Sequence, residues 1–263
     1  MKSSVILRGI FAILGFLGIL FILLPILHIF FSSSLKAIKE TLKEKELWKA
    51  IWVSISAAGI SVIIAFILGI PVGYAIARIN FPGKRFLESL TNLPIAIPHV
   101  AVGIALLSLL NEKTLLGKFF KTFHISFVDT FYGVVVAMLF VSFSFVISAS
   151  ITGFSAVSKE LEMVSRSLGA GPTYTFLRIT FPLAFPSILR GGILAFARAI
   201  SEVGALLILA YYPKTASIFM YERFEEFGLD SATPVTIVVI VCCLIIFFSM
   251  LYLSRKFFKG LDA

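Results

Sequence analysis

Long apolar runs alternate with short polar segments along the whole chain. Each run is ended by charged or turn residues and is long enough to cross a bilayer, which takes roughly 20 mainly apolar residues. The six runs are Gly9–Phe31, Ala50–Ala77, Leu87–Leu110, Phe131–Gly153, Leu183–Ala210 and Thr233–Leu253. They lack the polar–apolar alternation of a membrane barrel. The pattern predicts an all-α polytopic membrane protein with six transmembrane helices.

Composition supports this prediction. Of the 263 residues, 59% are hydrophobic and 14% are charged, whereas soluble domains have about 45–50% and about 25%. This argues against an ordinary soluble enzyme and against a disordered chain. The first apolar run is longer than the apolar region of a signal peptide, about 7–15 residues, so we expect a retained helix.

The net charge of +9 bears on topology. Six spans place both termini on one side, and with cytoplasmic termini the inner segments carry twelve Lys and Arg residues against ten outside. The short segments Arg78–Arg85 and Arg255–Lys259 hold basic but no acidic residues, which the positive-inside rule assigns to the cytoplasm. We therefore expect a multi-pass protein of the cell membrane, surrounded by lipid, with both termini cytoplasmic and no nucleic-acid partner.

The chain lacks the usual motifs of catalysis. It contains no G-x-x-x-x-G-K-[ST], no H-E-x-x-H and no G-x-S-x-G, so neither nucleotide hydrolysis, zinc nor a serine nucleophile is indicated. The three histidines lie in separate segments, and the two cysteines are adjacent in an apolar run. We predict no catalytic residue and no metal site, and an intramembrane enzyme lacks its usual residues.

Three regions follow from this division. Residues 1–49 hold the first span and Leu35–Trp48, whose apolar positions at helical spacing predict a short amphipathic helix on the outer surface, or else a solvated lead-in to the second span. Residues 50–254 form a core of five spans, and residues 255–263 a short basic cytoplasmic tail.

The connection between the fourth and fifth spans, residues 154–182, is the most informative segment. Ser158 can cap a helix with acidic residues in its first turn, and Gly169 stops it. Pro172 suits the start of a second short helix. Leu161, Val164 and Leu168 form an apolar stripe on the first helix. Either lipid headgroups or a soluble partner subunit covers this stripe.

Arg198 and Glu202 are the only ionisable residues well inside a predicted span. A spacing of four places both on one side of the fifth helix, where an isolated charge would cost at least about 2.5–3.5 kcal/mol. The pair either lines an anion pathway or fixes helix packing. In the third span, Pro94, Pro98 and Gly103 predict a bend that either frees carbonyl groups to line a cavity or only shapes packing.

The connection resembles the "EAA" loop of ABC-importer permeases. Gly169, nine residues, and then Ile179-Thr180-Phe181-Pro182 match that family's pattern. The E-A-A triplet is replaced by Met163-Val164-Ser165, Phe181 replaces a leucine, and Glu162 lies one place early. The resemblance implies a coupling helix that docks on an ATP-hydrolysing subunit. Its implied contact residues are Glu160, Leu161, Glu162, Val164, Arg166, Leu168, Gly169, Ala170 and Pro182.

A second resemblance narrows the family. Phe196–Ala205 is similar to the R-A-x-x-E-x-G-A run of permeases for tetrahedral oxyanions, and Leu93–His99 looks most like the molybdate/tungstate branch. This implies a type I ABC-importer permease fold. The pathway residues that it suggests are Pro94, Pro98, His99, Arg198 and Glu202.

The same resemblance implies an assembly. Two copies of this chain would form a homodimer, two ATP-binding cassette subunits would carry ATP and Mg, and an extracytoplasmic binding protein would deliver the oxyanion. The chain itself would bind no cofactor and would not be an enzyme. The alternative is an ion-coupled secondary transporter or channel without an ATPase partner, for which several buried carboxylates or helices broken in corresponding halves are typical.

Overall fold

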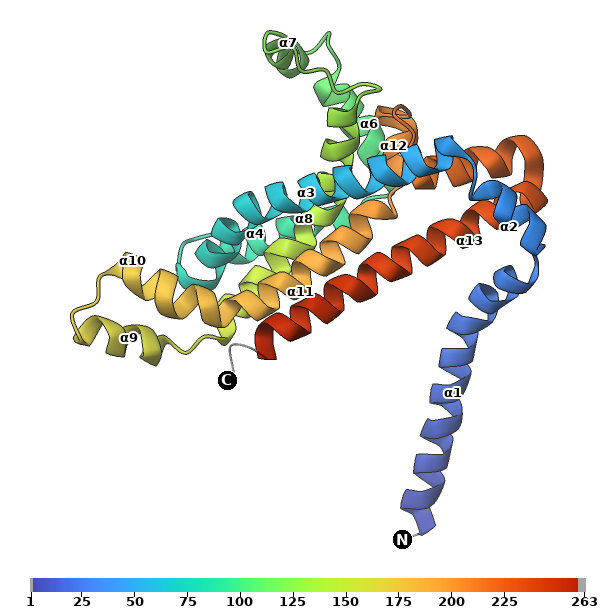
Figure 1. Cartoon of the computed structure of the whole chain (residues 1–263). Helices are drawn as coiled ribbons and strands as arrows, with labels where there is room; N and C mark the ends of the chain where they lie inside the picture. The colour runs from blue at the N-terminus through green and yellow to red at the C-terminus, as the bar shows by residue number, and fades with distance from the viewer. Residues whose placement is uncertain (1, 260–263) are drawn as a thin grey trace.

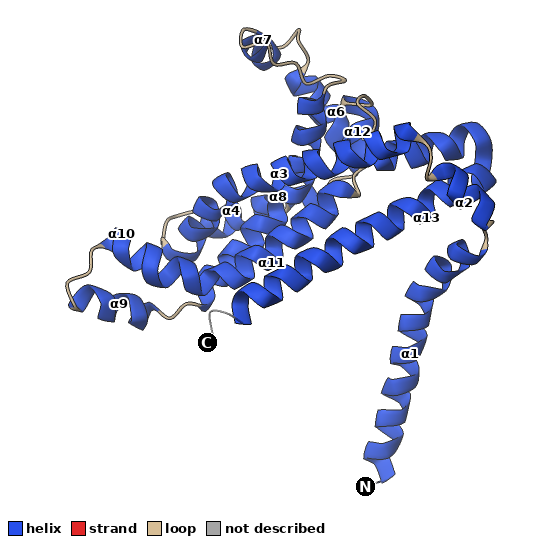
Figure 2. Ribbon diagram, in the orientation of Figure 1, coloured by secondary structure: helices blue, strands red, loops and turns tan. Residues whose placement is uncertain are grey.

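The computed structural model describes the backbone of residues 2–259 and the side chains of residues 7–256. Every regular element in this part of the chain is a helix (Figure 2), which confirms the all-α prediction. The elements are α1 (Lys2–Phe31), α2 (Leu35–Thr41), α3 (Lys45–Arg78), α4 (Lys84–Thr91), α5 (Leu93–Ala96), α6 (His99–Leu110), α7 (Leu115–Lys121), α8 (Phe131–Ala156), α9 (Lys159–Ser167), α10 (Pro172–Thr175), the π-helical turn η1 (Phe176–Thr180), α11 (Phe181–Ile200), α12 (Gly204–Leu209) and α13 (Ala216–Lys259).

Helices α3, α8 and α11 form the centre of the molecule, and α13 runs alongside them (Figure 1). Their shared core is built from small and branched side chains that are fully buried, such as Ala57, Met138, Ala199 and Leu206. Helices α9 and α10 lie at one end of this bundle, and the short pair α6 and α12 pack together toward the other.

Helix α1 stands away from the bundle (Figure 1). The span Leu7–Phe31 is strongly apolar, and none of its most apolar stretch is buried inside the chain. Its surface is therefore left to lipid or to another polypeptide. The following segment is shorter than expected: Ser34 caps α2 by accepting from the Ala37 N–H at 3.1 Å, but α2 ends at Thr41 and α3 already begins at Lys45.

The prediction of one continuous third span over residues 87–110 is wrong. This stretch is divided among α4, α5 and α6. Pro98 disfavours helical backbone at the residue before it, and both Ile97 (ψ 133°) and Pro98 (ψ 134°) are extended. The predicted bend at the prolines is confirmed. Within residues 2–259, five helices can cross a membrane by length and composition, and there are six spans if α6 and α7, which are bent by 67°, count as one.

The fifth and sixth spans also depart from expectation. Helix α11 ends at Ile200, and α12 starts at Gly204 after a break. The expected separate second helix of the connection instead continues through α10 and η1 into α11, so that Pro172–Ile200 is one span. Helix α13 is kinked at Gly228 (φ 75°) and runs to Lys259, into the predicted tail; residues 260–263 lie outside the described part.

Candidate functional site

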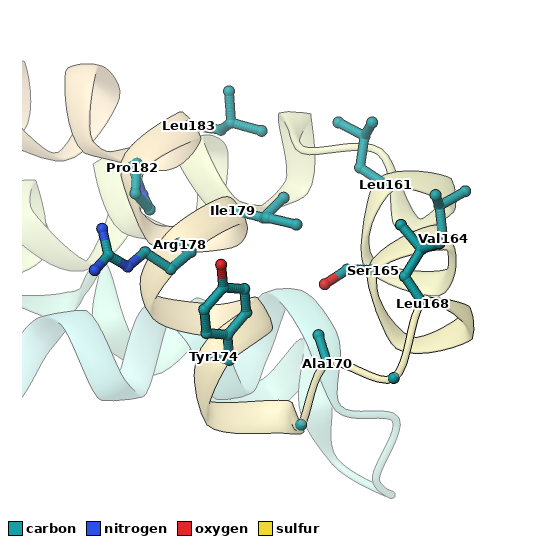
Figure 3. A pocket seen from close by; sticks show the side chains of 12 residues that line it. Leu161, Val164, Ser165, Leu168, Ala170, Tyr174, Arg178, Ile179, Pro182 and Leu183 are labelled. Atoms are coloured by element: carbon teal, nitrogen blue, oxygen red, sulfur yellow. The ribbon is translucent and has the colours of Figure 1, made fainter.

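The connection between α8 and α11 folds into two facing walls. Helix α9 forms one wall, and α10, η1 and the start of α11 form the other (Figure 3). They enclose an open hollow of about 920 Å³. Its lining is mainly apolar and consists of Leu161, Val164, Ser165, Leu168, Gly169, Ala170, Gly171, Tyr174, Arg178, Ile179, Pro182 and Leu183.

Local sequence signals fix both ends of α9. The Ser158 hydroxyl accepts from the Glu160 N–H at 3.1 Å. At the other end the N–H groups of Gly169 and Ala170 donate to the carbonyls of Arg166 and Ser165 at 3.0 and 3.1 Å, a Schellman motif. Gly169 adopts the left-handed conformation that this motif needs (φ 87°). Both predicted ends of the helix are confirmed.

The predicted apolar stripe is left uncovered. Leu161, Val164 and Leu168 are 47%, 57% and 83% exposed and lie along one wall of the hollow, opposite Tyr174 and Ile179 (Figure 3).

Six of the predicted coupling residues line the hollow, and three do not. Glu160, Glu162 and Arg166 are absent from the lining. The opposite wall, which includes Tyr174 and Arg178, was missed. It could have been found from Pro182, because residues three and four positions earlier share a helix face with it.

Glu162 points inward instead. Its Oε1 lies 2.8 Å from Arg78 Nη2 and accepts from the Thr180 hydroxyl at 2.9 Å. Arg78 Nη2 also donates to the Val157 carbonyl at 2.8 Å. We call Arg78, Glu162 and Thr180 the helix-end cluster, because they join the end of α3, the first turn of α9 and the last residue of η1.

At the other end of the bundle, three predicted pathway residues meet. Glu202 Oε2 lies 2.8 Å from both Arg198 Nη2 and His99 Nδ1, and Arg198 Nη2 lies 2.9 Å from His99 Nε2. Arg198 Nη2 also lies 2.5 Å from His99 Nδ1, so the tautomer of the ring decides which ring nitrogen accepts from Arg198 and whether Nδ1 donates to Glu202. We call His99, Arg198 and Glu202 the histidine cluster.

Three helix ends assemble the histidine cluster. His99 begins α6, Arg198 lies in the last turn of α11, and Glu202 precedes α12, whose Ala205 N–H donates to Glu202 Oε1 at 2.8 Å. The positive ends of α6 and α12 favour the carboxylate, and the negative end of α11 favours the guanidinium. Glu202 is 1% exposed, whereas the side chains of Arg198 and His99 are 22% and 46% exposed. The predicted pairing of Arg198 with Glu202 is confirmed, although Glu202 lies beyond the end of the helix.

Gly204 allows this close approach: a Cβ atom there would lie 2.7 Å from His99 Cβ. Pro98 directly precedes His99 and sets the start of α6. Pro94 is not part of the cluster; it lines a separate apolar hollow between α5 and the helices α3 and α8.

A further ion pair lies beside the loop between α12 and α13. Lys214 Nζ contacts both oxygens of Glu222 at 2.6 Å, and this hydrogen-bonded carboxylate raises the pKa of the Lys214 ammonium. Asp129 accepts from the Tyr211 N–H at 2.9 Å and so joins this loop to the segment before α8. Tyr211 and Glu222 lie in segments that resemble the molybdate/tungstate branch, but no motif marked Lys214 or Asp129. Among the side chains of residues 7–256, no group of three or more His, Cys, Asp or Glu could hold a metal ion.

The fold is that of a membrane-spanning transport component with an exposed apolar surface on α9. Residues 65–259 match the family described as "Binding-protein-dependent transport system inner membrane component", and the chain belongs to this family. This membership supports the importer interpretation over an ion-coupled transporter or channel, and the relatives named below are permease proteins rather than enzymes.

Several curated relatives are similar over most of their length. The chain is 43% identical to the "Molybdate/tungstate transport system permease protein WtpB" of Thermococcus kodakarensis, over 88% of this chain and 89% of that protein. It is 39% identical to the protein of the same description from Pyrococcus abyssi, over 94% and 95%. A "Probable sulfate transport system permease protein cysT" of Chlorokybus atmophyticus is 32% identical over 77% and 72%.

Solved structures confirm the fold of an ABC-importer permease. A chain of the bacterial alginate ABC transporter in complex with an alginate pentasaccharide-bound periplasmic protein has a TM-score of 0.77 at 16% identity, with 97% and 96% of the two chains covered. A chain of the inward-facing MetNI methionine ABC transporter has a TM-score of 0.64 at 14% identity, with 81% and 95% covered.

Proposed function

We propose that this chain is the permease subunit of an ATP-driven importer for molybdate or tungstate, and that it works by alternating access. The observation that carries the proposal is the identity of 39–43% to proteins described as molybdate/tungstate permeases. The lower identity of 32% to a probable sulfate permease supports the molybdate/tungstate branch. In this proposal the ATPase subunit, rather than this chain, carries ATP and Mg.

The exposed stripe on α9 would be the contact for two ATP-binding cassette subunits, one for each copy of this chain. Leu161, Val164 and Leu168 present apolar surface at the edge of an open hollow, and apolar side chains of this size are usually covered in an interface core. Because this surface would face the ATPase subunits, the proposal places α9, the connection and both termini in the cytoplasm.

The histidine cluster would line the oxyanion pathway at an interface between two copies of the chain. A charged group in the bilayer turns toward protein or a water-filled cavity rather than lipid. His99 and Arg198 are partly exposed in the single chain, so a second copy is needed to enclose them. Arg198 would offer the anion a positive charge that Glu202 keeps weak, which suits a pathway that must release its cargo. An extracytoplasmic binding protein would supply the affinity.

The test is reconstitution of the chain with its ATPase subunit and its binding protein. We expect co-purification of the ATPase subunit, and ATP hydrolysis that molybdate or tungstate stimulates through the binding protein more strongly than sulfate does. Wild-type chain that captures no ATPase subunit, or hydrolysis that ignores these oxyanions, contradicts the proposal.

Substitutions on α9 locate the contact. Leu161→Asp together with Val164→Asp should abolish capture of the ATPase subunit. Met163→Asp is the matched control, because Met163 lies on the same helix and is 58% exposed but does not line the hollow. If Met163→Asp loses capture of the ATPase subunit as the double variant does, or if the double variant still captures it, the contact lies elsewhere.

A further inference from the structure

The helix-end cluster buries an ion pair beneath the surface proposed for docking. The side chains of Arg78 and Glu162 are 8% and 12% exposed. Removing two such charges from water is costly unless each is paired and hydrogen-bonded. Here the carboxylate has two partners, Arg78 and Thr180, and the guanidinium has a second acceptor in the Val157 carbonyl.

The contacts of the helix-end cluster connect four different elements of the fold. Arg78 is the last residue of α3, Val157 ends α8, Glu162 lies in α9, and Thr180 ends η1. A second contact beside it, 3.0 Å between the Ser165 and Thr175 hydroxyls, holds α9 against α10. The inner face of α9 is thus bonded to α3, η1 and α10. Its outer face is apolar and uncovered.

Aromatic packing makes the base of this region continuous with the bundle. The Tyr74 ring meets the edges of Phe154 and Phe176 with centroid distances of 5.2 and 5.0 Å. These rings come from α3, α8 and η1. A displacement of α9 can therefore reach the transmembrane helices through Glu162, which pairs with Arg78 at the end of α3 and accepts from Thr180 at the end of η1.

Thr180 closes the π-helical turn, and such turns are frequent at functional sites. The turn stands between α10, which lines the hollow, and α11, which carries Arg198 at its far end. Its last residue is fixed by the carboxylate of Glu162. One continuous path of covalent and hydrogen bonds thus runs from α9 through η1 and along α11 to the histidine cluster.

We propose that Glu162 and Arg78 are positioning residues that make α9 move with α3 and α11, and that Glu162 is not a contact for the ATPase subunit. This inference rests on the proposed function of α9 as the docking helix. Glu162 is largely buried, faces Arg78 and Thr180, and takes no part in lining the hollow, so an approaching subunit meets the apolar stripe instead.

The test separates docking from transmission. Glu162→Gln keeps the size of the side chain and an acceptor for Thr180 but removes the charge that pairs with Arg78. We expect the variant to capture the ATPase subunit as the wild type does, and oxyanion uptake and oxyanion-stimulated ATP hydrolysis to fall at least tenfold. Arg78→Gln should behave in the same way, and the double variant should lose no more than either single variant, because the two residues act as one unit.

Glu88→Gln is the control for loss of a carboxylate. Glu88 is exposed and lies on α4, and its variant should transport as the wild type does. Hydrogen exchange gives a measurement independent of transport: in Glu162→Gln the amides of α9 and η1 should exchange at least tenfold faster, with α8 unchanged.

Three results would overturn the inference. They are unchanged uptake in Glu162→Gln, loss of ATPase capture in that variant, and unchanged exchange in α9. If the wild-type chain captures no ATPase subunit, the proposed function itself fails, and that result is read from the wild type alone.

Discussion

The histidine cluster and the helix-end cluster are both built around a buried Arg–Glu pair at 2.8 Å, yet they hold different kinds of structure. The histidine cluster sits where three short or broken helices end, and its carboxylate caps α12. The helix-end cluster joins the end of the long helix α3 to the short helix α9 and the π-helical turn η1, and its arginine closes the α8–α9 junction. One pair stabilises a break in the backbone, and the other connects separate elements to one another.

The burial of the two arginines follows this division. Arg78 is 8% exposed and enclosed by its own chain, whereas Arg198 is 22% exposed beside the half-exposed His99. A cluster that faces outward can meet cargo or a second copy of the chain, while an enclosed cluster can act only through the helices that it joins. Breaking either buried pair should reduce stability. Changes to the histidine cluster should also act on transport directly, whereas changes to the helix-end cluster should act on it only through coupling.

The largest effect is expected for Arg198→Gln. This variant leaves the Glu202 carboxylate buried without its guanidinium partner, with only the His99 ring and the Ala205 N–H still bonded to it, and breaking one side of a buried pair costs about 3–5 kcal/mol. Arg198→Gln combined with Glu202→Gln should recover most of that loss, because a glutamine amide can still accept from the Ala205 N–H. Thermal unfolding in detergent measures both variants.

The double variant also tests the pathway. If it folds and yet transports the oxyanion at the wild-type rate, the histidine cluster is only a packing element. If the single variant is as stable as the double, the carboxylate does not depend on Arg198.

Local signals explain which parts of the two clusters the sequence predicts. Arg198 and Glu202 are four residues apart, a spacing that pairs side chains on any helix. Ser158 and Gly169 mark the ends of α9 through contacts within a few residues. Pro98 likewise marks its own break, since its effect on the preceding residue needs no tertiary contact.

The missed contacts depend on packing between distant segments. Nothing near Arg78 indicates Glu162 as its partner, because the pair forms only once α3 and α9 are placed side by side. The break between α11 and α12 was missed for the same reason: Ser201, Glu202 and Val203 interrupt the helix without a proline. The break is held by the Glu202 cap and by the close approach of Gly204 to His99.

Gly204→Ala should give the next largest loss of stability. The added methyl group would lie 2.7 Å from His99 Cβ, and overpacking of this kind costs about 1–3 kcal/mol. Gly59→Ala is the matched control, because a Cβ atom at Gly59 in α3 meets nothing within 4 Å; it should be neutral or stabilise the helix by up to about 1 kcal/mol. Equal unfolding temperatures for the two variants would show that α6 and α12 separate easily, and that the histidine cluster is less rigid than its contacts indicate.

Gly169→Ala tests the end of α9 beside the proposed docking surface, and we expect a smaller effect than that of Gly204→Ala. An L-residue in the left-handed conformation costs about 1–2 kcal/mol. Relief of this strain would change the backbone beside Leu168 in the stripe and should weaken capture of the ATPase subunit by at most about 30-fold. Gly171→Ala is the control, because Gly171 also lines the hollow but has an ordinary φ of −70°. Titration of the ATPase subunit onto both variants measures the difference. Equal affinities would mean that the end of α9 is free to rearrange.

The smallest effect on stability is expected for the Lys214–Glu222 pair. Because lysine can lose its proton and arginine does not, this pair is a reference for the pH dependence of the two Arg–Glu clusters. Because Glu222 raises the pKa of Lys214, this contribution to stability is fully present below the unfolded pKa of about 10.4. It is lost as the pH rises through the higher folded value. The difference in unfolding temperature between the wild type and Lys214→Met should therefore be constant from about pH 8 to 10 and shrink above that range. Both Arg–Glu clusters should show no such decline, since arginine stays protonated. A difference that stays constant above the folded pKa would mean that Lys214 stabilises the loop by the packing of its aliphatic side chain rather than by its charge.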